Sequence, residues 1–225
     1  MKTNVFYKPP NKFRFEEFNT LSYSFEDSPN CLLTTETGPG PFFIPESIYR
    51  IDITEGQTGI GLFIGLKIVN ASNCSNLHRA KVEIWQANAE GEYSGFSILE
   101  EGETPPLKPT NQERWLRGWQ ESDHLGFVEF KTIYPGKYLN RTNHIHLRIS
   151  YQDQVLLTTQ VFFPQNINDF VSTISPYDQN PRFVTNYNDP VIQRYNGCRG
   201  CWPKVSGFGT RYIATLTIGV NLQGR

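Results

Sequence analysis

The sequence contains no long apolar run and no excess of charge of either sign. It has 21 Lys and Arg residues against 22 Asp and Glu, so we expect no basic surface that would bind nucleic acid or anionic lipid. No apolar segment approaches the roughly 20 residues that a membrane-spanning helix requires. Residues 1–7 lack the apolar centre of a secretory signal, although a secreted protein loses that signal on maturation. We therefore expect neither a nucleic-acid nor a membrane partner, and the compartment stays open.

The sequence also lacks a long amphipathic helix, and it has only one Met. Gly (18), Pro (15) and aromatic residues (14%) are frequent, a composition typical of strands and tight turns. Short strand-like runs follow one another, and only residues 112–119 and 166–172 hint at helical turns. The runs cover residues 48–53, 62–69, 81–85, 127–132, 144–150, 155–163 and 212–220. This pattern predicts an all-β, two-sheet β-sandwich of the immunoglobulin or prealbumin kind.

The organisation along the chain follows from the same pattern. Residues 1–40 are predicted to form an extended, irregular N-terminal arm, because they contain isolated aromatics and no helical period. Residues 41–225 are predicted to form one sandwich domain, since 225 residues suffice for a single substantial core. Loops at 86–126 and 176–209 are long, and long loops on a β scaffold commonly carry function.

Cysteine is scarce, with four residues that allow three disulfide pairings. Cys198 and Cys201 form a CxxC motif, which can be half a zinc site or a redox pair. The sequence has no second CxxC, so we favour a structural disulfide or plain thiols. Whether Cys31 pairs with Cys74, or Cys198 with Cys201, is left open by the sequence.

Two histidines carry the most informative pattern in the chain. His144 and His146 are two residues apart in a run that alternates like a strand, so their side chains are expected on one face, where both can reach one metal ion. Two structural histidines on a half-buried strand would give the same pattern. The neighbourhood favours a metal, because Tyr138 follows a Pro-Gly turn and Arg141 precedes the strand, while Tyr93 lies in a glycine-flanked segment upstream.

Two phenolates and two neutral imidazoles would form a distinctive set of metal ligands. Phenolate is a hard, anionic donor that stabilises a trivalent ion, which indicates Fe(III). An Fe(II) oxygenase would be expected to use two His and one carboxylate, and no carboxylate stands at the matching place in this strand. A zinc hydrolase would favour three His, or two His with Glu, and would normally lack Tyr ligands.

Several motifs in a fixed order, between about residues 37 and 220, carry a family resemblance. They are GPGPFF at 38–43, VEIWQANAEGEYSG at 82–95, LRGWQ at 116–120, FKTIYPGKY at 130–138, RTNHIH at 141–146 and TQVFF at 159–163. In this order they resemble the intradiol ring-cleavage dioxygenases, the catechol and protocatechuate dioxygenase superfamily. The chain lacks the helical N-terminal segment of the dimeric catechol enzymes, so it is similar to the compact, single-domain members.

The resemblance implies a function and a site. The metal ligands would be Tyr93, Tyr138, His144 and His146, holding one non-haem Fe(III), with Tyr138 and His144 axial. Arg141, Gln160 and Tyr138 would be the catalytic residues. Residues 41–225 would be the catalytic domain, and its small-molecule partners would be a catechol or polyphenol and O2, converted to a cis,cis-muconate-type diacid without NADH or flavin.

Alternatives remain at the level of sequence. Tyr134 could replace Tyr138 as a ligand, Tyr93 could pack beside Trp85, and Arg141 and Gln160 could be ordinary turn and strand residues. The competing functions are a non-catalytic β-sandwich binding module and a metallohydrolase, or a lactone or isourate hydrolase, on a similar sandwich. The sequence does not specify the preferred catechol or decide between a monomer and a homodimer.

Overall fold

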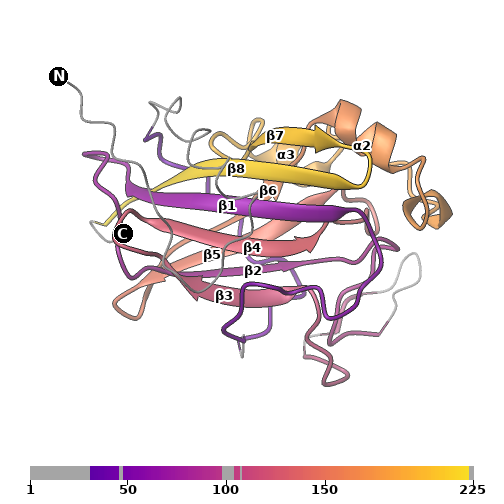
Figure 1. Ribbon diagram of the computed structural model, residues 1–225, viewed down its shortest axis with the longest axis horizontal. Helices are drawn as coiled ribbons and strands as arrows, with labels where there is room; N and C mark the ends of the chain where they lie inside the picture. Colours follow the sequence, from indigo (N-terminus) through magenta and orange to yellow (C-terminus); the bar gives the residue numbers. More distant parts are fainter. Residues whose placement is uncertain (1–30, 46–47, 98–103, 107, 223–225) are drawn as a thin grey trace.

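A computed structural model describes residues 31–45, 48–97, 104–106 and 108–222 of the chain (Figure 1). Within these residues, eight strands form two four-stranded sheets, which confirms the predicted two-sheet β-sandwich. The strands are β1 (Gly61–Asn70), β2 (Lys81–Gln86), β3 (Arg117–Glu121), β4 (Phe127–Ile133), β5 (His144–Tyr151), β6 (Gln154–Phe162), β7 (Lys204–Phe208) and β8 (Arg211–Val220). The helical elements are α2 (Gln165–Val171), η1 (Tyr177–Gln179) and α3 (Pro190–Arg194).

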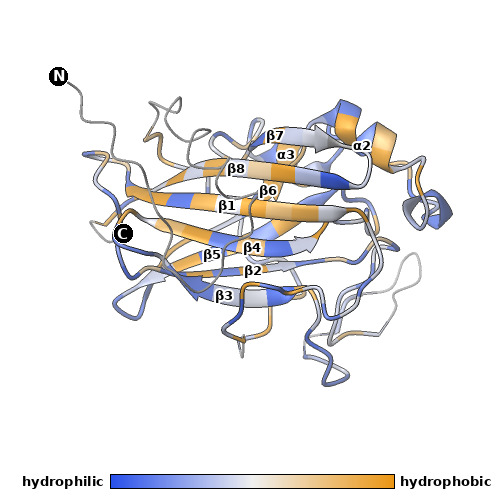
Figure 2. Ribbon diagram, in the orientation of Figure 1, coloured by the Kyte–Doolittle hydropathy of each residue, from blue (hydrophilic) through white to orange (hydrophobic). Residues whose placement is uncertain are grey.

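The first sheet has the strand order β4-β1-β8-β7. Strand β1 pairs in parallel with β8 and antiparallel with β4. Figure 2 shows many hydrophobic residues along β1, which lies in the middle of this sheet between β4 and β8. Ile64, Leu66 and Ile68 of β1 are fully buried in the main core between the sheets.

The second sheet has the order β3-β2-β5-β6 and is antiparallel throughout. Alternation along β5 directs Ile145, Leu147 and Ile149 into the main core. Because successive side chains of a strand point to opposite faces, His144 and His146 lie on the other face of this sheet. The second sheet therefore separates the main core from a second layer, which the loops and the chain before β1 build on its outer face.

Some predicted elements differ from the structure. Residues 112–119 were expected to show helical turns, but the segment ends in strand β3. Residues 48–53 make only isolated bridges, from Tyr49 to Trp119 and from Asp52 to Lys131, rather than a strand. Strand β7 and helix α3 lie inside the predicted 176–209 loop. By contrast, α2 confirms the predicted turns at 166–172.

The described part of the predicted N-terminal arm runs along the sandwich. Thr34 N donates to Gly219 O at 2.9 Å and Thr37 N to Thr158 O at 3.0 Å. Residues 1–30 of the arm lie outside the described residues, so its division from the domain at residue 40 remains a prediction. Among the described residues, no helix is both long enough and apolar enough to cross a membrane.

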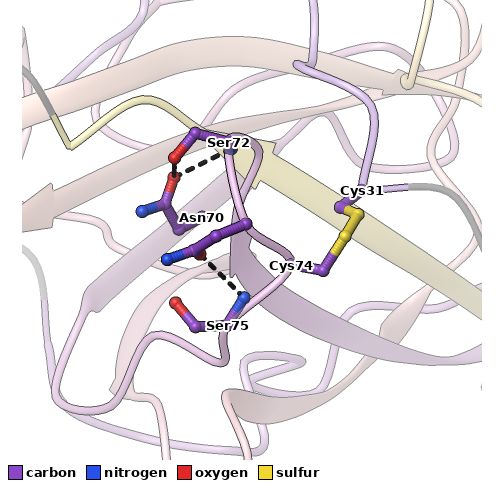
Figure 3. The surroundings of a disulfide bond; sticks show 6 residues. Cys31, Asn70, Ser72, Cys74 and Ser75 are labelled. Atoms are coloured by element: carbon purple, nitrogen blue, oxygen red, sulfur yellow. Dashed lines mark hydrogen bonds between the residues drawn. A yellow bond between two sulfur atoms is a disulfide. The ribbon is translucent and has the colours of Figure 1, made fainter.

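A disulfide joins Cys31 to Cys74 in the turn after β1 (Figure 3). This turn is shaped by Asn70, whose Oδ1 accepts hydrogen bonds from Ser72 N at 3.0 Å and Ser72 Oγ at 2.8 Å. Cys198 and Cys201 are instead free thiols and buried. The structure thus answers the question that the sequence left open, with one disulfide and one pair of plain thiols.

Candidate metal centre and active site

The two histidines of β5 face each other across a buried site. Their Nε2 atoms are 3.2 Å apart, and their side chains are 1% and 0% exposed. His144 Nδ1 lies 2.6 Å from the carbonyl oxygen of Thr142. Since a carbonyl only accepts hydrogen bonds, Nδ1 carries the proton and His144 Nε2 presents a lone pair to the site.

Both predicted tyrosines reach the same point. The Tyr93 hydroxyl is 3.5 Å from His144 Nε2. The rings of Tyr93 and Tyr138 meet edge to face with centroids 5.1 Å apart, and the Tyr138 ring lies 5.6 Å from the His144 ring. Tyr93, Tyr138, His144 and His146 are all buried, so the structure brings together the four side chains that the sequence singled out.

Glycines allow the two tyrosine loops to approach each other. Gly91, just before Tyr93, has φ +90°, and a Cβ there would lie 2.0 Å from the backbone oxygen of Lys137. Gly136, in the Pro-Gly turn before Tyr138, lies against Asn88, and a Cβ there would meet its backbone oxygen at 2.3 Å. Only glycine fits such contacts, so these positions set the spacing between the two tyrosines.

The GPGPFF motif also packs against the site. A Cβ on Gly40 would lie 2.9 Å from His146 Cε1. The Phe42 ring stacks on Tyr93 with centroids 4.4 Å apart, and the Trp85 ring lies parallel to His146 at 5.0 Å. These aromatic neighbours surround the polar atoms and shield them from water.

The electrostatics of the site favour neutral donors. Burial lowers the pKa of His144 to about 3, with the Arg141 charge as a further cause. Burial, the neighbouring His144 and Arg141 hold the pKa of His146 well below its ordinary value. Burial raises the pKa of Tyr93 well above its ordinary value, and Tyr138 adds to this. The protein alone therefore keeps imidazoles and phenols uncharged, and a cation is needed to stabilise phenolates here.

These residues fit a bound metal ion. His146 Nδ1 is buried without a hydrogen-bond partner, while the Nε2 atoms of His144 and His146 converge on one point next to a phenol oxygen. Within the described part of the chain, no group of three or more His, Cys, Asp or Glu side chains is placed to hold a metal. The side chains that converge here are two imidazoles and two phenols, and donors of these kinds suit a hard trivalent ion better than zinc.

Arg141 and Gln160 lie beside this centre. Arg141 Nη2 donates to Gln160 Oε1 at 2.5 Å, and both residues are buried. A turn closed by a hydrogen bond from Arg141 N to Tyr138 O, at 2.9 Å, holds the guanidinium next to Tyr138. Burial raises the pKa of Tyr138, and the Arg141 charge opposes this.

Two further residues were not singled out from the sequence. Asp189 is fully buried and accepts a hydrogen bond from Arg141 Nε at 2.9 Å. Arg117 of β3 is buried against the Tyr93 loop, with its Nη2 donating to Ser94 O at 2.7 Å and its Nη1 to Phe42 O at 2.6 Å. The Asp189-Pro190 pair is a typical helix start, but nothing local in the sequence indicates either long-range contact.

Tyr134, the alternative to Tyr138, lies elsewhere. Its hydroxyl donates to Asn168 Oδ1 at 2.6 Å, and its ring packs against Phe163 and Tyr212 in the main core at 4.7 and 5.7 Å. Only Tyr138 of the two lies beside the histidines.

Comparison with known proteins finds relatives that share the sequence and the fold of this chain. An intradiol ring-cleavage dioxygenase from Tetranychus urticae is 33% identical and has a TM-score of 0.81, and the match covers 87% of this chain and 97% of that one. The dioxygenase domain of a carbohydrate-binding fusion from Streptomyces sp. SirexAA-E shares the fold at 24% identity, with a TM-score of 0.61 over 84% of this chain and 98% of that one. No family profile matches the sequence.

A curated relative, catechol 1,2-dioxygenase of Acinetobacter baylyi, is 29% identical over 153 residues, which are 57% of this chain but only 45% of that protein. The fold and these relatives are those of ring-cleaving dioxygenases, a class of oxidoreductase. The chain belongs to the intradiol ring-cleavage dioxygenase family.

Proposed function

We propose that this protein is a non-haem Fe(III) dioxygenase that cleaves the aromatic ring of catechol-type substrates between the two hydroxyls. Both atoms of O2 would enter the product, a cis,cis-muconate-type diacid. The observation that carries the proposal is the convergence of four buried donors, with 3.2 Å between the two His Nε2 atoms and 3.5 Å from His144 Nε2 to the Tyr93 hydroxyl.

In this proposal Tyr93, Tyr138, His144 and His146 hold the metal. A bound ferric ion supplies the Lewis acidity that lowers the pKa values of a catechol and the redox capacity for its reaction with O2. The hydrogen bond from His144 Nδ1 to Thr142 O fixes the tautomer that leaves Nε2 free to bind. Phe42 and Trp85, which pack against Tyr93 and His146, keep water away from the reacting groups.

The protein's own side chains perform the proton and charge steps. Tyr138 Oη, as a phenolate, accepts a proton from one catechol hydroxyl, which is general base catalysis. Arg141 stabilises the negative charge that develops on the deprotonated substrate. Gln160, whose Oε1 accepts from Arg141 Nη2 at 2.5 Å, orients that guanidinium and the substrate by hydrogen bonding.

Oxygen uptake tests this proposal. Purified protein supplied with catechol should consume one O2 per catechol and form a ring-opened diacid, with no requirement for NADH. The iron-loaded protein should also be red to burgundy, because phenolate ligands transfer charge to ferric iron. A hydrolase or a binding module would consume no oxygen, and a colourless iron-loaded protein would contradict tyrosine ligation.

A further inference from the structure

The two carboxylate oxygens of Asp189 bind different parts of the molecule. Oδ1 accepts hydrogen bonds from Val191 N at 2.9 Å and Ile192 N at 3.1 Å, and so caps helix α3. Oδ2 accepts from Arg141 Nε at 2.9 Å and from Thr142 N at 2.9 Å. A single fully buried side chain thus joins α3 to the turn that carries Arg141.

This arrangement fixes the plane of the Arg141 guanidinium. Its Nε is held by Asp189 and its Nη2 by Gln160. The planar guanidinium has little freedom to rotate when two of its N–H donors are hydrogen-bonded. Neither partner is exposed to solvent, since Asp189 is 0% and Gln160 2% exposed, so water does not compete for these contacts.

Helix α3 is itself anchored against the strand next to the histidines. Ile192, Cys198 and Cys201 form a buried cluster with Phe162 of β6, and Phe162 is the cross-strand partner of His144. The Cys201 backbone oxygen accepts a hydrogen bond from Phe162 N at 3.0 Å. Asp189 therefore lies at the start of a helix that packs against β6, and not in a free loop.

We propose that Asp189 is a positioning residue that acts through Arg141, aiming the guanidinium at the substrate's developing negative charge. The inference rests on the proposed function, in which Arg141 is the residue that meets this charge. Three backbone N–H groups, of Thr142, Val191 and Ile192, also bind the carboxylate, so its charge remains solvated when Arg141 is removed. A buried ion pair is weak evidence for added stability, and in this proposal the pair serves to orient the guanidinium.

The variant Asp189→Asn separates the two roles. Asn is a good helix cap and can keep an oxygen toward Val191 N and Ile192 N. Its amide NH2 then faces the donors Arg141 Nε and Thr142 N, which repels the guanidinium. We expect kcat/KM for catechol to fall about 10- to 100-fold, while iron content and the visible colour stay close to wild type.

A double-mutant cycle shows whether Asp189 acts through Arg141. Arg141→Gln should lower kcat/KM strongly, and adding Asp189→Asn should lower it by less than about twofold more, because the group that Asp189 positions is already gone. A crystal structure of Asp189→Asn should show the guanidinium turned away from residue 189 and from Gln160. Ile68→Val is the stability control, since Ile68 lies on β1 in the main core and not in the support of Asp189. It should lower the melting temperature but leave kcat/KM within about twofold.

The outcomes distinguish this inference from the proposed function. A coloured, active wild type whose Asp189→Asn variant keeps full activity overturns the inference alone. The inference is also overturned if the losses of kcat/KM from Arg141→Gln and Asp189→Asn multiply in the double variant. It is overturned as well if the Arg141 guanidinium keeps its wild-type position in the crystal structure of Asp189→Asn. A wild type without iron or oxygen uptake removes the proposed function and the inference with it. Should Asp189→Asn fail to fold, Asp189→Ser, which keeps a capping oxygen and loses the contact to Arg141, takes its place with the same expectations.

Discussion

At the scale of single residues, Tyr93 and Tyr138 distinguish this site from metal centres built on histidine and carboxylate alone. Their hydroxyls are kept neutral by burial, so only a strongly polarising cation can ionise them. The neighbouring imidazoles of His144 and His146 are neutral for the same reason, burial, and can donate lone pairs. In the proposed function, a bound ferric ion completes the charge of the site that these four side chains form.

Tyr138→Phe tests the role of the second phenol. Without Tyr138 Oη the variant loses one charge-transfer partner and the proposed proton acceptor. We expect a partly bleached, shifted visible band and a fall in kcat of about 10²-fold or more, measured by absorption and oxygen uptake. Unchanged turnover and colour would remove Tyr138 from the mechanism.

Tyr134→Phe is the matched control, four residues upstream. The Tyr134 hydroxyl binds Asn168 in the main core, away from the histidines. This variant should lose about 1 kcal/mol of unfolding free energy and keep both the colour and the activity.

The same residues show what a sequence can reveal about a site. Strand alternation placed His144 and His146 on one face. Tyr93, Tyr138 and Arg141 were noted from their neighbourhood and given roles by the family resemblance, which also added Gln160. All six are buried and close to one another. The sequence did not indicate Asp189 as a site residue, because Asp189 and its partner Arg141 are 48 residues apart in the chain. Nothing local marks a helix-capping aspartate as the partner of a distant arginine.

At the scale of elements, the site depends on two loops that touch through glycine. The loop after β2 carries Tyr93 and the Pro-Gly turn carries Tyr138, and Asn143 Nδ2 at the start of β5 donates to Pro135 O at 2.7 Å. This hydrogen bond ties the turn that carries Tyr138 to the residue just before strand β5, which carries the histidines.

Gly91→Ala tests this contact. Its φ of +90° costs an alanine about 1–2 kcal/mol, and the new Cβ collides with the Lys137 backbone, which must move. We expect the loop shift to separate Tyr93 from Tyr138, so that iron content and the visible band fall well below wild type.

Gly56→Ala is the control for this prediction. Gly56 has a similar φ of +78° but open space around its Cβ position. It should show a comparable loss of stability in chemical unfolding, with iron and colour retained. Full iron occupancy in Gly91→Ala would contradict the role given to the loop contact.

Strands could be predicted from the sequence where the pattern of side chains along the segment determines them. The runs that became β1, β2, β4, β5, β6 and β8 alternate or are rich in β-branched residues, and the structure has strands there. Strand β3 contains Gly118 and polar residues, and its strand character comes from backbone pairing with β2. Such pairing is a tertiary effect that local propensity does not reveal.

At the scale of the whole molecule, the second sheet acts as a platform with a different chemistry on each face. The face toward the first sheet is hydrophobic. A row of paired residues crosses the other face from β3 to β6, namely Arg117, Trp85, His146 and Gln160. Strand order and register create this row, which is why the sequence predicted the sandwich but not Arg117 as a neighbour of the site.

The most direct test of the account is a crystal structure of the iron-loaded protein with an anomalous difference map at the iron absorption edge. We predict one iron peak, bonded to Tyr93 Oη, Tyr138 Oη, His144 Nε2 and His146 Nε2. A peak elsewhere, or an ion at the histidines with both phenol oxygens beyond bonding distance, would contradict the central claim.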